Sequence, residues 1–294
     1  TEFSPTMLDK FIDLLNINDP EADYNKNNEI RILVKCYIVS LFIPEVPKVI
    51  LMLHGEQGSA KTTFGELIRA LVDPSIVKTF AFPRDINEFI QQLAHNYVTV
   101  YDNISAIRDW ISDLLCRAVT GSGFSKRRLY TDDDDFIYSL KRCIILNGIT
   151  VAATKADLLD RGLIIQLHRV PKNKWKKIED IWREFEQIKP QLLGYIFDVL
   201  VKVLAWKQEN GHPEIELFRM VDWTEYCEII SRCMGYEPLE FIKAYKNNIG
   251  LQSEEVINSS LVALALIPYM NELQSPEIRL TATKWLSDLT EKAE

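Results

Sequence analysis

The chain has 294 residues, 47% of them hydrophobic and 26% charged, which is typical of a globular protein with room for a sizeable core. Its net charge of −8 argues against a protein that simply coats nucleic acid, although a local basic element is compatible with it. No apolar stretch is long enough to span a bilayer, no signal peptide is visible, and we expect no membrane partner.

The five cysteines form no C-x-x-C pair and the four histidines are scattered, so we expect reduced thiols inside a cell and no histidine metal site. The sequence begins at Thr1, and we expect it to be a segment of a longer protein whose other domains are not seen here.

The predicted elements change type along the chain. Residues 7–17 and 29–43 have apolar positions at helical spacing, and Pro44 and Pro47 follow the second helix. Short apolar runs then predict strands at 49–53, 76–82, 97–101, 143–146 and 163–167. Helical stretches fall between them, at 62–72, 85–95, 104–119 and 151–159. This alternation predicts an α/β fold with a mostly parallel sheet covered on both faces.

After Pro171 the pattern is helical, with amphipathic segments at 175–188, 192–208, 223–234, 238–248 and 254–272. We therefore predict an N-terminal helical segment (1–46), an α/β core (47–170) and a C-terminal helical region (171–294).

A phosphate-binding loop is predicted between the first strand and the helix that follows it. The sequence from Gly55 to Thr63 reads GEQGSAKTT, and its glycines permit the tight path that turns backbone N–H groups toward phosphates. Lys61 would reach the β- and γ-phosphates of ATP, and the Thr62 hydroxyl would ligate Mg²⁺. The predicted loop residues are Gly55, Gln57, Gly58, Ser59, Ala60, Lys61, Thr62 and Thr63. Ala60 stands where the usual pattern has glycine.

A second motif ends the strand at 97–101 with Asp102 and Asn103. An acid at this point can hold the magnesium opposite the phosphate loop. Many ring ATPases place a glutamate after this aspartate to orient the attacking water. Asn103 can hydrogen-bond water but cannot take its proton, so slow turnover or a different base is the alternative.

Two further polar residues accompany later strands. Asn147 leaves the strand at 143–146, where an amide could position water near the γ-phosphate. Arg161 precedes the strand at 163–167, where its guanidinium could reach a neighbouring subunit and stabilise charge on a transferring phosphoryl group. A strand-end cap for Asn147 and a surface salt bridge for Arg161 are the alternatives.

Taken in this order, the motifs resemble those of the AAA+ ATPases in the superfamily-three helicase group. The similarity is greatest to the poxvirus-type helicase modules found behind primases in phages, viruses and archaeal plasmids, and it covers residues 48–170. The resemblance implies that Lys61, Thr62 and Asp102 bind Mg-ATP, that Asn147 is the first sensor, and that Arg161 acts in trans.

The resemblance also implies a homo-oligomeric ring, expected to be a hexamer, that binds single-stranded DNA. A primase or polymerase domain would be fused to it in the full-length protein. The location would be the cytoplasm, or the host compartment where viral or plasmid DNA replicates.

Lys126, Arg127 and Arg128 form a basic segment before the run Asp132–Asp135. In the resembling helicases this interval carries channel-facing hairpin residues, which would follow the phosphates of one strand. The alternative is a basic turn that the aspartates neutralise.

We therefore expect an ATP hydrolase that acts as a DNA helicase or translocase in replication. A nucleotide-dependent switch or assembly ATPase without unwinding is the alternative, which Asn103 favours and the basic segment disfavours. A small-molecule kinase would need a lid of arginines, and the late arginines are too dispersed to form one.

Overall fold

The structure is a computed structural model. It describes residues 3–121, 123–127, 135–139, 141–148 and 155–259, together with 266, 269–270, 281, 283–285 and 287. In these parts of the chain no helix is long and apolar enough to cross a membrane.

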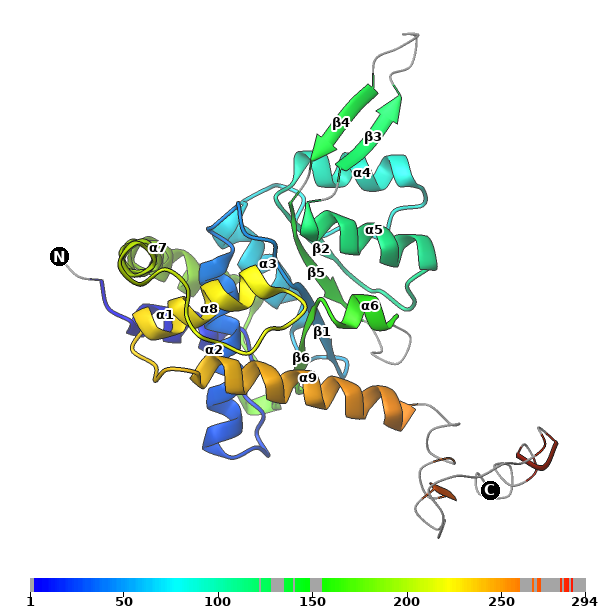
Figure 1. Cartoon of the computed structure of the whole chain (residues 1–294). Helices are drawn as coiled ribbons and strands as arrows, with labels where there is room; N and C mark the ends of the chain where they lie inside the picture. The colour runs from blue at the N-terminus through cyan, green and yellow to red at the C-terminus, as the bar shows by residue number, and fades with distance from the viewer. Residues whose placement is uncertain are drawn as a thin grey trace.

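The core of the molecule is a four-stranded sheet with the order β2-β5-β1-β6 (Figure 1). The strands are β1 (Ile50–Gly55), β2 (Val98–Tyr101), β5 (Cys143–Asn147) and β6 (Gly162–Leu167). All neighbouring pairs run parallel, which confirms the predicted α/β class with a parallel sheet. The carboxyl ends of all four strands therefore meet at one edge, where the motif residues follow.

Successive side chains of a strand point to opposite faces of the sheet, so they belong to two separate apolar clusters. Ile50 and Met52 pack with α4 (Ile86–His95), α5 (Asp109–Thr120) and α6 (Ala156–Leu159). Leu51 and Leu53 pack on the other face with α3 (Lys61–Val72) and the flanking helices. Burial on both faces explains why these strands read as continuous apolar runs.

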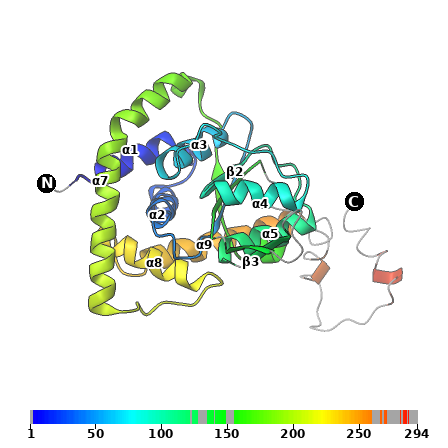
Figure 2. The same ribbon diagram turned by 90° about the horizontal axis from the view of Figure 1, so that it is seen from above.

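The helices from the two ends of the chain pack together against one face of the sheet. α1 (Thr6–Leu14) lies along α7 (Ile178–Asn210), and α2 (Tyr24–Ser40) contacts α8 (Val221–Cys233) and α9 (Glu240–Ser259) (Figure 2). Trp223, which is fully buried, donates from Nε1 to Ser40 Oγ at 3.1 Å. The first and last parts of the sequence thus share one apolar core with the sheet.

The strand predicted at 76–82 is wrong. Ile76 is fully exposed and Val77 half exposed, so this run has no surface to pack against. Only Phe80 pairs with the sheet, in an isolated bridge to Tyr101. The bridge still matters for the site, because the Phe80 carbonyl accepts from Asp102 N at 3.0 Å and fixes the chain where β2 ends.

Some of the predicted helices differ in their bounds. α5 begins at Asp109, later than the predicted 104, because residues 104–108 form the loop that leaves β2. The predicted helices at 175–188 and 192–208 are one continuous helix, α7, which contains Pro190. Its buried residues form one stripe, and their burial outweighs the hydrogen bond that proline removes; they are Phe185, Leu192, Tyr195, Ile196, Val199 and Val203.

A two-stranded antiparallel hairpin, β3 (Gly123–Arg127) and β4 (Asp135–Ser139), projects away from the sheet beyond α4 and α5 (Figure 1). A hairpin in this interval is what the resemblance led us to expect.

Candidate functional site

The predicted phosphate loop joins β1 to α3, and its backbone requires two of its glycines. Gly55 has φ +140°, and a Cβ there would lie 2.0 Å from the Leu167 carbonyl oxygen. Gly58 has φ +82°. Ala60 also adopts the left-handed region, with φ 67°, so alanine occupies a position that glycine would adopt with less strain. α3 starts at the next residue and presents its N-terminus to the loop, an arrangement suited to an anion.

Lys61 is folded into this loop. Its Nζ donates to the carbonyls of Gly55 and Glu56, both at 2.8 Å, and to Ser59 Oγ at 3.2 Å. Partial burial lowers the pKa of Lys61, and the charge of Asp102 opposes that shift. The ammonium group therefore has neutral partners, which it could exchange for an anion.

Three residues from different elements converge beside Lys61. The Thr62 hydroxyl donates to Asp102, with 3.0 Å to Oδ2. The Asn147 amide donates from Nδ2 to Thr62 Oγ1 at 3.2 Å and to Asp102 Oδ1. Register brings Asp102 and Asn147 together, because Tyr101 pairs with Leu146 and each of the two is the next residue along the chain. A hydroxyl and a carboxylate at this spacing are ligands suited to a hard cation such as Mg²⁺.

Asn147 has an unused acceptor. The residue is 2% exposed, and its Oδ1 has no hydrogen-bond partner. Because a buried polar atom without a partner is costly, a ligand atom that donates to Oδ1 would be stabilised here.

Asn103 is exposed and has φ 56°, a conformation that asparagine tolerates better than most residues. Its backbone N–H donates to Asp102 Oδ1 at 2.9 Å. The following residue, Ile104, donates from its N–H to the Asn147 carbonyl at 2.9 Å, which ties the loops after β2 and β5 together.

Arg161 lies at the other end of the sheet from the phosphate loop. It precedes β6, whose first residue pairs with Ile50 at the start of β1, about 17 Å of strand away from Gly55. Its side chain is 12% exposed and is bonded through Nη1 to the carboxylate and carbonyl of Asp157. The structure therefore does not bring Arg161 to the Lys61 cluster of its own chain.

Three residues that contact the loop carry no recognisable pattern in the sequence. Asn16 donates from Nδ2 to the Ser59 carbonyl at 3.2 Å and to the His168 carbonyl at 2.8 Å. Arg169 lies beside Gly58, with its Cγ and Nε 4.0 Å from the position of a Cβ there. The Gly58 carbonyl also accepts from Val170 N at 3.2 Å, so the end of β6 fixes the loop.

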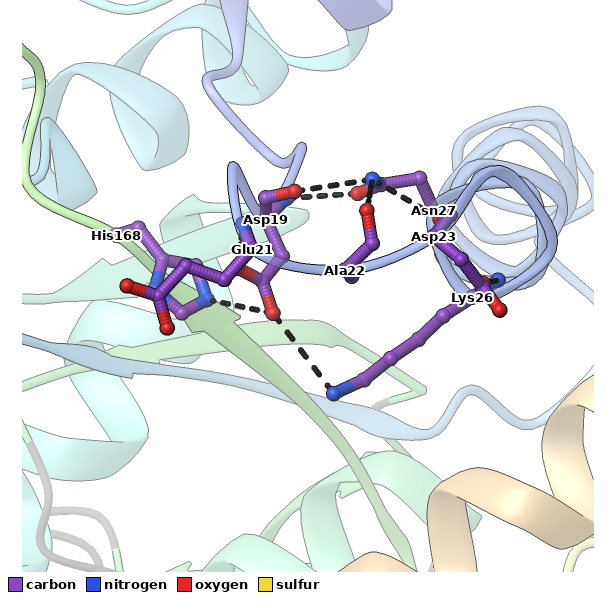
Figure 3. Close-up of polar contacts among 7 residues, drawn as sticks. All are labelled: Asp19, Glu21, Ala22, Asp23, Lys26, Asn27 and His168. Atoms are coloured by element: carbon purple, nitrogen blue, oxygen red, sulfur yellow. Dashed lines mark hydrogen bonds and ion pairs between the residues drawn. The ribbon is translucent and has the colours of Figure 1, made fainter.

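A polar network joins the N-terminal segment to the same strand end (Figure 3). Asp19 Oδ2 lies 3.5 Å from His168 Nε2 and 3.7 Å from Lys26 Nζ. Asn27 accepts from Asp19 N at 2.7 Å and donates to the Asp19 and Ala22 carbonyls. The turn before α2, in which Asp23 caps the helix by accepting from Lys26 N, is thereby attached to the residue that follows β6.

Two cavities lie beside the candidate site, and phosphate-loop residues line the second. One, of about 680 Å³, opens beside Asp102 and Asn103 and has Arg84 and Arg108 on its wall. The other, of about 560 Å³, opens beside Gly58, Ala60 and Thr63.

Of the predicted nucleic-acid residues, Lys126 and Arg127 lie in β3, where Arg127 pairs in register with Asp135 of the acidic run. Arg128 lies outside the described residues. The five cysteines are all free thiols. Across the described parts of the chain no cluster of three His, Cys, Asp or Glu residues could hold a metal ion.

Comparison with known proteins adds a family and a fold. Two structures of the NrS-1 C-terminal region, in its apo form, align with the whole chain at 12% identity with TM-scores of 0.50 and 0.51. The chain spans 63% and 67% of those two structures, and the likeness shows that the fold is shared. A structure of JCV helicase aligns with 84% of this chain and 73% of its own at 15% identity, with a TM-score of 0.36.

No curated protein matches the sequence. A family model does, over residues 12–251, which is more than half of the chain and includes every element of the candidate site. The chain therefore belongs to the family of replication proteins of actinomycete integrative conjugative elements.

Proposed function

We propose that this chain is the ATP-hydrolysing motor module of a replication protein, and that it moves or unwinds DNA as part of a ring. The observation that carries the proposal is the convergence of Lys61, Thr62, Asp102 and Asn147 at one edge of a parallel sheet, beside a helix N-terminus. Membership in a replication-protein family supports a role on DNA.

In this proposal the chain's own groups divide the work on the triphosphate. The backbone of the loop and Lys61 hold the phosphates, and Thr62 with Asp102 would hold Mg²⁺. When bound, Mg²⁺ supplies neutralising charge to the phosphate oxygens. Asn147 would accept, through its unpaired Oδ1, a hydrogen of the attacking water.

In this proposal Arg161 does not reach the γ-phosphate that its own chain binds, because it lies at the opposite end of the sheet, beside Asp157. A neighbouring subunit in a ring would supply Arg161 instead, at the boundary between two copies. Arginine suits this position because its planar fork stabilises charge spread over a phosphoryl group.

A slow nucleotide-dependent switch is the second candidate, and Asn103 is the observation that favours it. The position after Asp102 carries an amide, which cannot remove a proton from water. The switch would bind ATP and change its assembly state without moving along DNA.

ATP hydrolysis by the parent chain, measured with and without single-stranded DNA, tests the proposal. We expect turnover that DNA stimulates, and a loss of about 100-fold or more in Lys61→Ala, since one preorganised charge at a transition state contributes on that scale. Unchanged hydrolysis in Lys61→Ala would contradict the assignment of the loop. Hydrolysis that depends on Lys61 but ignores DNA would favour the switch.

A further inference from the structure

Arg69 is a buried arginine that the proposed mechanism does not use. It belongs to α3, the helix that begins at Lys61, and only 1% of its surface is exposed. Arginine is rarely buried so completely unless a carboxylate pairs with it. Among the residues that the structure describes, no carboxylate forms a salt bridge with Arg69. Burial lowers the pKa of Arg69, and the charge of Asp73 opposes that shift. The place of this side chain in the fold therefore needs another explanation.

The guanidinium group of Arg69 holds the start of β2. Its Nη1 donates to the Val98 carbonyl at 2.8 Å, and its Nη2 donates to Asn96 Oδ1 at 2.5 Å. The orientation of the Asn96 amide is fixed in turn, because its Nδ2 donates to the Gln92 carbonyl at 2.7 Å. Arginine suits this position because its rigid fork offers several donors in one plane. The strand that leads to Asp102 is thereby attached to the helix that carries Lys61.

The same guanidinium group lies against the ring of Phe80. Its Cζ is 5.0 Å from the ring centroid, a distance typical of a cation–π contact, which is stronger where water is excluded. The Phe80 N–H donates to the Val100 carbonyl at 2.8 Å, and the Phe80 carbonyl accepts from the Asp102 N–H at 3.0 Å. Phe80 pairs with β2 in a single bridge, and its ring also borders an apolar cluster. Its backbone position therefore depends on what its ring contacts.

α3 and β2 thus meet along most of the strand. At the end of β2 the Thr62 hydroxyl donates to Asp102 at 3.0 Å, and at its start Arg69 holds the chain. Between these contacts the helix approaches closely, because a Cβ on Gly65 would lie 2.6 Å from Val100 Cγ1. A shift of β2 relative to α3 would therefore change the distance between the Thr62 hydroxyl and the Asp102 carboxylate.

We propose that Arg69 is a positioning residue of the metal site, which sets Asp102 against Thr62 by holding both the start of β2 and Phe80 to α3. The inference rests on the proposed function, since it assumes that Thr62 and Asp102 hold Mg²⁺ beside a nucleotide. Arg69 acts through the backbone that carries Asp102. Groups that orient the ligands of a metal in this way change the affinity for the metal when they are removed.

The experiment measures how Mg²⁺ affects the binding of a non-hydrolysable ATP analogue by the whole chain, starting from a metal-free sample in EDTA. Arg69→Met keeps a long side chain and removes the charge and the donors. Without Mg²⁺ it should bind the analogue like the parent, because the loop and Lys61 hold the phosphates. The Mg²⁺ concentration that gives half of the metal-dependent tightening should rise about 10-fold or more, the scale on which groups that orient metal ligands contribute.

Two changes at Phe80 test the contact through which Arg69 acts. Phe80→Leu removes the ring and should raise the Mg²⁺ requirement in the same direction, whereas Phe80→Tyr keeps a ring and should resemble the parent. In the double variant of Arg69→Met and Phe80→Leu the two effects should not add, because both act on the position of Asp102. Arg69→Lys should lose less than Arg69→Met, since it keeps the charge and a donor. If Arg69→Met does not fold, Arg69→Lys and Phe80→Leu decide the question.

Leu71→Ala is the matched control for a general loss of stability. Leu71 lies on the same helix, is 3% exposed and packs in the apolar cluster on that face of the sheet. Its truncation should lower the melting temperature because it leaves a cavity, and it should retain the Mg²⁺ requirement of the parent. An equal rise in the requirement of Leu71→Ala would reduce the effect of Arg69 to destabilisation and would overturn the inference.

A parent-like Mg²⁺ requirement in Arg69→Met would also overturn it. The proposed function would stand in that case, as long as binding of the analogue by the parent depends on Lys61 and responds to Mg²⁺. A parent chain that binds no analogue, or binds it without regard to Mg²⁺, would overturn the assignment of the site itself.

Discussion

Asn147 Nδ2 lies 3.2 Å from Thr62 Oγ1, although 85 positions separate the two residues in the chain. The contact exists because β1 and β5 are parallel neighbours, with Leu53 in register with Asn147, so the loop after one strand meets the end of the other. The carboxylate of Asp102 completes the group from the adjoining strand.

This relationship predicts the behaviour of Asn147→Ala. Nucleotide affinity should be nearly unchanged, and turnover should fall by about 100-fold, the scale on which one donor or acceptor contributes at a preorganised site. Single-turnover hydrolysis and equilibrium binding measure the two effects separately. Thr99→Val is the matched control, because Thr99 is a buried polar residue on β2 whose hydroxyl has no partner, and its turnover should equal that of the parent. Parent-like turnover in Asn147→Ala would exclude a role in the reaction.

Arg161→Ala should retain nucleotide binding and lose turnover by about 1,000-fold or more, if it serves a neighbour's site as arginine fingers do. Mixing Arg161→Ala with Lys61→Ala chains should restore activity. At some boundaries of a mixed ring, the Arg161→Ala chain supplies an intact Lys61 and the neighbouring Lys61→Ala chain supplies an intact Arg161. Arg219→Ala is the control, since Arg219 also lies near Asp157, at 3.6 Å, but is more exposed. No rescue in rings shown to contain both chains would argue against a trans role.

Neutralising Lys126, Arg127 and Arg128 should weaken single-strand binding and remove DNA stimulation of hydrolysis. Affinity should also depend less steeply on salt, by roughly 0.7 in the log–log slope for each phosphate that the variant no longer neutralises. Basal hydrolysis should persist if the segment only contacts phosphates, whereas a fall would place Arg128 at the subunit boundary.

A triple change of Lys10, Lys202 and Lys243 to alanine is the control for the hairpin, because these exposed lysines alter the net charge equally. If the hairpin variant binds DNA with the parent's affinity and salt slope, the segment is an ordinary basic turn paired with the acidic run.

Asp9 predicts a pH dependence of stability. Burial alone would raise its pKa, but hydrogen bonds from Lys35 and Arg31 outweigh burial and lower it. A carboxyl with a lowered folded-state pKa stabilises the fold above its unfolded value near 3.8, and that stability is lost as pH falls through the folded pKa. Asp9→Asn should therefore lower the free energy of unfolding by roughly 1 kcal/mol at pH 7 after solvent screening.

Urea unfolding of the parent and Asp9→Asn between pH 2 and pH 7 measures this effect. The difference between the two should vanish at the acid end, where Asp9 is protonated in both the folded and the unfolded chain. A difference that stays constant across the range would mean that the ion pairs with Lys35, at 2.6 Å, and Arg31 contribute nothing.

The sheet and one half of the candidate site could be predicted from the residues alone. Apolar runs of strand length predicted β1, β2, β5 and β6. Because the carboxyl ends of parallel strands lie at one edge of the sheet, the polar residues at the ends of β1, β2 and β5 were expected to lie close together. The role of the loop glycines could be predicted for a local reason, because their φ values are ones that other residues adopt only with strain.

The other half of the site became visible only in the folded chain. Asn16 reaches Ser59 and His168 across 43 and 152 positions, and the cavity beside Gly58 is built from both ends of the chain; no local pattern marks either feature. Packing also joined two predicted helices into α7 across Pro190 and left 76–82 without the burial that a strand requires. Short-range spacing encodes backbone conformation, whereas contacts between distant segments depend on how whole helices pack, which the linear pattern does not record.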